Sequence, residues 1–242
     1  MERNGVVGSH LRARTATRCL VGVSLLVGSL AGIPSMSHAQ TRQPDSAGNP
    51  PAPPAAGESK DIETATLGAG CFWCTEAVFR RLKGVRSVVP GYSGGRVKSP
   101  TYKQVSTGKT GHAEVVQITF DPKEISYAEL LEVFWKTHDP TTLNRQGPDF
   151  GTQYRSVIFY HSDPQRKTAE KCKSELDAAR AFDSPIVTRI VPFREFYRAE
   201  DYHKDYFELH PQQPYCATYI RPKVEKLEKV FRDKLKAPAS RQ

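Results

Sequence analysis

The fold is decided around residues 70–74, which read Gly70-Cys71-Phe72-Trp73-Cys74. A short apolar run, residues 64–69, leads into this stretch, and residues 71–83 carry apolar side chains at helical spacing. The glycine therefore marks the end of a strand, and the first cysteine opens a helix. A strand that passes directly into a helix predicts a protein in which strands and helices alternate.

The place of Cys71 at a helix start also suggests chemistry. Free N–H groups and the positive end of the helix dipole stabilise a thiolate, so we expect a pKa for Cys71 below its ordinary value of about 8.5. Cys74 lies one turn further on, although meeting Cys71 at disulfide distance would require local unwinding of the helix. A structural disulfide or two buried thiols remain the alternatives. One C-x-x-C supplies only two metal ligands, so no metal site is expected.

The rest of the chain extends this alternation. Residues 126–137 begin with a capping box, Ser126 to Glu129, and predict a helix. Residues 140–151 predict a polar loop. The order is strand, helix, two strands, helix, strand, helix, strand, helix, which indicates an α/β class, an α+β sandwich with a mixed sheet flanked by helices. The further strands are expected at 85–89, 113–120, 154–160 and 186–192, and the further helices at 162–181 and in the tail from Glu200 onward.

Length and composition are those of a globular chain with one sizeable core. The chain has 242 residues, 38% of them hydrophobic, and 35 Lys+Arg against 26 Asp+Glu give a net charge of +9. These values exclude a polytopic membrane protein and a wholly disordered chain. We expect one catalytic domain over 62–236 and a flexible tail over 237–242. The basic residues are spread along the chain, so no nucleic-acid partner is expected.

The N-terminal residues have the pattern of an export signal. A basic start is followed by an uncharged, mostly apolar run over residues 19–33 and by Ser37-His38-Ala39. We predict a signal peptide over 1–39, cleaved after Ala39, and a Pro/Ala-rich disordered linker over 40–61. The apolar run is shorter than the about 20 residues of a membrane span, and an uncleaved anchor is the alternative. The predicted location is outside the cytoplasm, in the periplasm.

Three further residues could join the chemistry or be structural. Glu114 shares a strand face with Val116 and Ile118, so burial would raise its pKa and make it a general acid, unless it simply reaches solvent. Cys216 lies in a Pro-rich segment, where a mobile thiol could attack the oxidised form of another cysteine, or be buried, or form a bridge to Cys172. Cys172 itself is expected to be structural, because it falls in the middle of a predicted helix.

Five motifs together resemble one known family. In order they are Gly70-Cys71-Phe72-Trp73, Gly91-Tyr92-Ser93-Gly94-Gly95, His112-Ala113-Glu114, Gly151-Thr152-Gln153-Tyr154-Arg155-Ser156 and Ala199-Glu200-Asp201-Tyr202-His203. This set resembles the peptide-methionine (S)-S-oxide reductases, the MsrA family, over essentially all of residues 62–235. The resemblance implies the ferredoxin-like fold of that family and an oxidoreductase that acts on sulfur with a disulfide as acceptor (EC 1.8.4.11).

The resemblance also implies a role for particular residues. Cys71 would attack the sulfoxide sulfur of methionine-S-sulfoxide, and Glu114 would protonate the oxygen as it leaves. A second thiol would then form a disulfide with the sulfenic acid on Cys71. The residues implied around the substrate are Tyr102 and Tyr154 as donors to the sulfoxide oxygen, Asp149 as a polar residue that arranges the pocket, and Phe72 and Trp73 as its apolar wall.

The choice of the second thiol stays open between two residues. Position 74 is a cysteine where many members have glycine, whereas residues 210–216 resemble the short tail that carries a resolving cysteine. We favour Cys216 for the resolving role over Cys74, because Cys74 would require the helix to unwind.

The resemblance implies no bound cofactor and an external thiol reductant. The donor would be a thioredoxin-like protein, or dithiothreitol in vitro, and the substrates would be free methionine sulfoxide and oxidised exported proteins. A monomer is expected. Two other classes remain as rivals: a thioredoxin-like thiol–disulfide oxidoreductase that uses Cys71 and Cys74 directly, and a tethered binding module whose cysteines form structural bridges.

Overall fold

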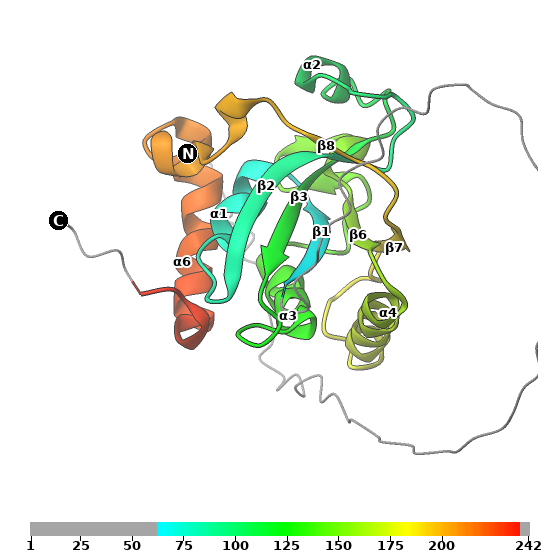
Figure 1. Ribbon diagram of the computed structural model, residues 1–242, viewed down its shortest axis with the longest axis vertical. Coiled ribbons are helices and arrows are strands. Elements are labelled where there is room, and N and C mark those ends of the chain that lie inside the picture. The colour runs from blue at the N-terminus through cyan, green and yellow to red at the C-terminus, as the bar shows by residue number, and fades with distance from the viewer. Residues whose placement is uncertain (1–61, 238–242) are drawn as a thin grey trace, which may run out of the picture.

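The computed structural model describes residues 62–237, which are built around a six-stranded mixed sheet (Figure 1). The strand order is β7-β6-β1-β3-β2-β8. All neighbouring pairs are antiparallel except β6 and β7, which are parallel. The strands are β1 (Glu63–Ala69), β2 (Val85–Ser93), β3 (Ala113–Phe120), β6 (Ser156–Tyr160), β7 (Arg189–Pro192) and β8 (Phe196–Arg198).

The helices and a small hairpin connect these strands. A separate two-stranded sheet, β4 (Arg145–Gln146) with β5 (Asp149–Phe150), lies within the predicted polar loop. A π-helix spans Cys216–Ile220, and single 3-10 turns span Thr152–Tyr154, Asp201–His203 and Arg232–Lys234. The α-helices are α1 (Phe72–Phe79), α2 (Tyr102–Val105), α3 (Tyr127–Thr137), α4 (Asp163–Ala178), α5 (Tyr206–Leu209) and α6 (Arg221–Val230).

The two faces of the sheet are covered differently. The main core joins one face, with Leu67 and Ile118, to α1 through Phe79 and to α3 through Leu130. The other face carries a smaller cluster, Ala113, Val115, Val157 and Phe159, which packs against Val191, Phe193 and Phe196. Burial of these side chains drives the assembly of the layers. The predicted class, a mixed sheet flanked by helices, is confirmed.

Several element boundaries differ from those predicted. Strand β2 continues past residue 89, where the predicted strand ended, through Ser93, because β3 on one side and β8 on the other pair with this extension. An added Cβ at Gly91 would come within 2.4 Å of the Tyr197 carbonyl oxygen, so glycine is needed for this close approach. Helix α1 ends at Phe79 rather than near residue 83. The short elements α2, β4, β5 and β8 were not predicted.

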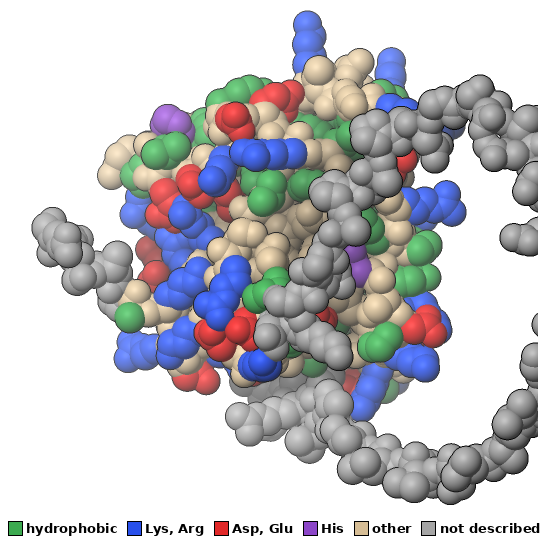
Figure 2. Space-filling model, in the orientation of Figure 1, with side chains coloured by type: hydrophobic (Ala, Val, Ile, Leu, Met, Phe, Trp, Pro, Cys, Tyr) green, Lys and Arg blue, Asp and Glu red, His purple; other side chains and the backbone are tan. Residues whose placement is uncertain are grey.

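The expected domain borders fall largely outside the described residues. The predicted signal peptide over 1–39, the linker over 40–61 and the tail from residue 238 onward are not described by the structure. Within residues 62–237, no helix combines the length and the apolar character that a membrane span requires. On the face of the molecule shown in Figure 2, Lys and Arg side chains alternate with Asp and Glu.

Candidate active site

Cys71 lies at the junction between β1 and α1. It occupies the N-cap position of α1 with non-helical backbone angles, φ −56° and ψ 127°. Gly70 before it has φ +91°, and a Cβ there would come 2.5 Å from the Gln146 side chain, so only glycine allows this turn. The buried strand and the buried helix fix Cys71 between them, and its side chain is 7% exposed.

Glu114 is buried beside the start of the same helix. It is 1% exposed, and its Oε2 accepts a hydrogen bond of 3.1 Å from the Phe72 N–H. Burial raises the pKa of Glu114 to about 8, which outweighs the opposite effect of this hydrogen bond. The carboxyl is therefore protonated at neutral pH, as a general acid must be. The alternative of a solvent-exposed glutamate is wrong.

Cys71 and Cys74 form a coupled pair of thiols. Their side chains hydrogen-bond each other, and this bond lowers the pKa of Cys74 to about 7. Burial, followed by the Cys74 partner, raises the pKa of Cys71 well above its ordinary value. The expected lowering of the Cys71 pKa is therefore wrong in this state, because desolvation and the neighbouring sulfur outweigh the helix N-terminus. Cys74 is instead the more acidic thiol of the pair, and Cys71 keeps its proton to higher pH.

Cys71 and Cys74 lie on the first turn of α1. Cys71 is the N-cap and Cys74 the third helical residue, so the two side chains meet with the helix intact. The Cys74 backbone N–H donates to the Cys71 carbonyl at 3.1 Å, which keeps the first turn closed.

Cys216 is not in a mobile loop, which is a second correction. It begins the π-helix and is 0% exposed, in one cluster with Cys71 and Cys74. Cys172 is buried in the main core on α4, apart from that cluster, so the alternative of a Cys172–Cys216 bridge is wrong. Within residues 62–237 the four cysteines form no disulfide. Packing of the C-terminal segment against α1 explains why a Pro-rich stretch is ordered here.

Two tyrosines lie within electrostatic reach of Glu114 and Cys71. Burial raises the pKa of Tyr102 to about 12, and it raises the pKa of Tyr154 further, with Glu114 as the next contributor in both cases. Both hydroxyls thus remain neutral donors at pH 7. The Tyr102 backbone N–H donates to Glu200 Oε1 at 2.8 Å, so the Ala199–His203 motif holds this tyrosine in place.

The aromatic residues after Cys71 pack on both sides of the site. Phe72 is buried in the core and stacks with Tyr102 at a ring separation of 6.3 Å. Trp73 is half-buried, lies flat on Tyr206 at 3.8 Å, and donates from Nε1 to His203 Nδ1 at 3.1 Å. The last motif therefore fixes Trp73 as well as Tyr102.

Asp149 and a residue that the sequence reasoning missed complete the site. Burial raises the pKa of Asp149, and its Oδ2 accepts a hydrogen bond of 2.5 Å from the Tyr215 hydroxyl. The same hydroxyl lies 3.9 Å from Cys74 Sγ. Tyr215 had no signal of its own beyond its position next to Cys216. It links the hairpin, the thiol pair and the C-terminal segment.

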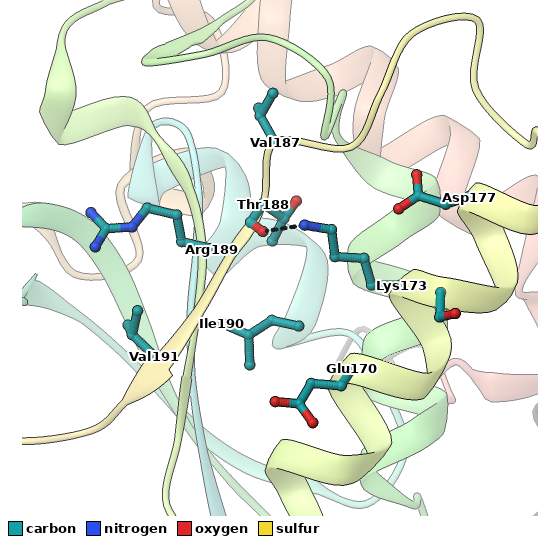
Figure 3. A pocket seen from close by; sticks show the side chains of 9 residues that line it. Glu170, Lys173, Asp177, Val187, Thr188, Arg189, Ile190 and Val191 are labelled. Carbon is teal, nitrogen blue, oxygen red and sulfur yellow. Dashed lines mark hydrogen bonds between the residues drawn. The ribbon is translucent and has the colours of Figure 1, made fainter.

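A surface cavity lies apart from the site around Cys71. About 660 Å³ lies between α4 and β7, and none of the predicted site residues lines it (Figure 3). Lys173 crosses it and donates to the Thr188 carbonyl at 3.1 Å. In the part of the chain that the structure describes, no three His, Cys, Asp or Glu side chains are grouped to hold a metal ion.

The fold and this site define a class of protein. The site has a buried thiol pair at a helix start, a protonated carboxyl and two neutral tyrosine donors. This arrangement is typical of a thiol-dependent oxidoreductase.

The comparisons with known proteins then give the family. The family model "Peptide methionine sulfoxide reductase" matches residues 63–235. The chain is 59% identical over 175 residues to the peptide methionine sulfoxide reductase MsrA of Saccharolobus solfataricus, covering 72% of this chain and 98% of that protein. It is 54% identical over 174 residues to the MsrA of Thermus thermophilus, with the same coverage. The chain belongs to the MsrA family, and its activity is that of a peptide methionine sulfoxide reductase (EC 1.8.4.11).

Solved structures agree with this assignment. Reduced Mxr1 of Saccharomyces cerevisiae matches with a TM-score of 0.61 and 39% identity, covering 67% of this chain and 93% of that one. Methionine sulfoxide reductase A of Corynebacterium diphtheriae matches with a TM-score of 0.56 and 34% identity, covering 64% and 78%. The thioredoxin-like rival is thus excluded as the family of this chain, and so is the binding module.

Proposed function

We propose that this chain reduces methionine-S-sulfoxide, free and in exported proteins, through a sulfenic acid on Cys71. The observation that carries this proposal is the burial of protonated Glu114 against the residue that follows Cys71. A sulfoxide bound there would meet a sulfur nucleophile and a proton donor. No other described carboxyl combines this burial with this position.

Reduction of the sulfoxide transfers its oxygen to Cys71. The Cys71 thiolate attacks the sulfoxide sulfur, Glu114 delivers its proton to the oxygen, and Tyr102 and Tyr154 donate hydrogen bonds to that oxygen. Attack joins the Cys71 sulfur to the substrate sulfur; the S–O bond and this new S–S bond then break as the hydroxyl passes to the Cys71 sulfur. The products are methionine and Cys71 sulfenic acid, so the substrate sulfur is reduced by two electrons and Cys71 is oxidised by two.

A proton must move from Cys71 to Cys74 before Cys71 can attack as a thiolate. In the free site Cys74 is the more acidic thiol, because its pKa is lowered to about 7 while burial raises the pKa of Cys71. Because the two sulfurs hydrogen-bond, the proton can transfer to Cys74 and leave the thiolate on Cys71. This places the nucleophile under the bound sulfoxide and a thiol beside it, ready for the next step.

We infer that Cys74 resolves the sulfenic acid, with Cys216 as the alternative. The Cys74 side chain lies in the same buried cluster as Cys71, one helical turn along α1. Cys74 thiol and the sulfenic acid form a disulfide and release water. An external dithiol, from a thioredoxin-like donor, then supplies two electrons and two protons. Cys216, buried in the same cluster, would resolve if Cys74 does not.

The test compares two reductants on variants of the three clustered cysteines. Dithiothreitol reduces a sulfenic acid directly, so turnover with it should require only Cys71, whereas turnover with a thioredoxin system should also require the resolving thiol. We expect C74S to lose thioredoxin-dependent turnover and C216S to keep it. The opposite result would move the role to Cys216. A parent enzyme that acts on the R epimer instead of the S epimer would contradict the substrate assignment.

Export and repair follow from the sequence alone and belong to the same proposal. The predicted leader over 1–39 supports a periplasmic enzyme. Its role there would be to restore oxidised methionines, whose polar sulfoxides disrupt apolar cores, and we propose that it acts as a monomer. No nucleic-acid partner is proposed. N-terminal sequencing of the secreted protein should begin at Gln40, and a chain that reads through Ala39 would contradict the predicted cleavage.

A further inference from the structure

A second cavity lies at the same end of the sheet as Cys71. Its volume is about 420 Å³, within the range of small-ligand sites. The register Ala69 to Ser156 and Val157 to Arg189 shows that β1 ends where β6 and β7 begin. Arg155, just before β6, shares a face with Val157 and Phe159, which is the face without the main helical core. The cavity is therefore separate from the site around Cys71.

The lining of this cavity is strongly one-sided in charge. Four cationic side chains line it, and no aspartate or glutamate does. In Figure 3 the Arg189 side chain extends from β7 on the side away from α4, so its guanidinium lies away from the cavity between α4 and β7. The four cations are Arg96, Lys109, Arg155 and Arg189.

Arg155 is the buried member of this group. It is only 8% exposed. Among residues 62–237, no carboxylate forms an ion pair with it. Nη1 donates to the Thr152 carbonyl at 2.7 Å and Nη2 to the Gly111 carbonyl at 3.0 Å, while Nε has no partner. Two of the five N–H donors are thus used, and both on neutral groups.

These two hydrogen bonds explain the position of Arg155 but not its charge. Burial, followed by the charge of Arg189, lowers its pKa to about 10, which still leaves the guanidinium charged at neutral pH. A buried cation with further cations beside it is unfavourable unless an anion is added. Gly94 leaves the guanidinium open, because a Cβ there would come 3.2 Å from Arg155 Nη2.

We propose that this cavity binds a small phosphate dianion against the guanidinium of Arg155, with Arg96, Lys109 and Arg189 at its rim. A doubly charged oxyanion fits because several cations meet without an acid, and guanidinium groups match phosphate oxygens in pairs. The source is either inorganic phosphate or the phosphate of a small phosphomonoester. The site is independent of the proposed chemistry at Cys71.

Calorimetric titration and thermal unfolding at constant ionic strength test this proposal. The titrants are inorganic phosphate, glycerol 3-phosphate and, as a monovalent control, acetate. We expect both phosphates to bind and to raise Tm, and acetate to do neither. Tighter binding of glycerol 3-phosphate would identify a phosphomonoester as the source, and tighter binding of phosphate would identify the free ion. Failure of both phosphates to bind would overturn the proposal, as would equal binding of acetate.

Matched variants locate the binding. R96Q/R189Q removes two rim cations, and R194Q/R232Q removes two exposed arginines that do not line the cavity. We expect at least tenfold weaker phosphate binding in the first double variant and unchanged binding in the second, with sulfoxide turnover unchanged in both. Equal weakening in both would show non-specific charge attraction and would overturn the proposal. R155Q should lose binding, and the rim variants decide the question if R155Q does not fold.

Discussion

The site around Cys71 and the cavity around Arg155 both bury ionisable groups, yet they treat charge in opposite ways. Burial of Glu114 raises its pKa to about 8, so the carboxyl escapes the cost of burial by keeping its proton. Arg155 remains charged, because even its lowered pKa of about 10 lies far above neutral pH. A buried acid thus becomes a proton donor, whereas a buried guanidinium becomes a receptor for an anion.

The largest expected effect in this comparison is the loss of the nucleophile. C71S should abolish sulfoxide turnover with dithiothreitol, because an alcohol in a buried site has no anionic form near neutral pH and cannot accept the oxygen as a sulfenic acid. Turnover of a methionine-S-sulfoxide peptide measures this. C172A, a buried cysteine outside the cluster, is the control and should retain turnover. Activity of C71S above background would contradict the role of Cys71.

The next effect should come from the proton donor. E114Q keeps the shape of the side chain but has no acidic proton, so kcat at pH 7 should fall by about 10²- to 10⁴-fold. In the parent, kcat should also decline above pH about 8, as Glu114 loses its proton. The alkaline decline should be absent in E114Q. A parent enzyme whose rate keeps rising through pH 9 would assign the proton to another group.

A smaller effect is expected from the tyrosine donors. Y102F and Y154F should each lower kcat by about tenfold, because the other hydroxyl still donates to the oxygen, and the double variant should lose about 10²- to 10³-fold. Steady-state kinetics of the two single variants and the double variant measure this. Tyr219, an exposed tyrosine on the π-helix, supplies the control variant Y219F. A double variant no slower than the singles would show that only one tyrosine contacts the oxygen.

The smallest effect is one of stability and sharpens the comparison of the two regions. In the unfolded chain Glu114 ionises near its ordinary pKa, and in the folded protein only near 8, so its contribution to stability is full below the ordinary pKa and is lost as pH rises through about 8. The slope is at most about 1.4 kcal/mol per pH unit. Chemical denaturation between pH 5 and pH 8 should therefore show a flatter dependence for E114Q than for the parent.

The arginine should behave differently in the same experiment. R155Q should keep the parental slope, because Arg155 stays charged throughout this pH range. Burial also raises the pKa of Glu76 to about 7, so Glu76 contributes a pH dependence of stability of the same sign in the parent and in both variants. A flatter slope in R155Q would mean that the two regions are coupled.

The main strands, the longer helices and the approximate positions of the site residues could be predicted from the sequence. The run into Gly70, the apolar face shared by Glu114 and Val116, and the capping box at Ser126 are local patterns, and the structure retains all three. The short elements could not be predicted. Strand β8 exists because Phe196–Arg198 pairs with the end of β2, and three residues carry no periodic signal of their own.

The sequence by itself determined that a cysteine follows a strand and opens a helix, because neighbouring residues decide where a strand ends and a helix begins. It also determined the family, through motifs that occur in a fixed order. Only the tertiary structure decided that Cys74 is the more acidic member of the thiol pair, that Tyr215 joins Asp149 to that pair, and that three further cations line a cavity with Arg155. The reason is physical: burial and charge–charge contacts depend on segments that meet only after folding, and these contacts set each pKa.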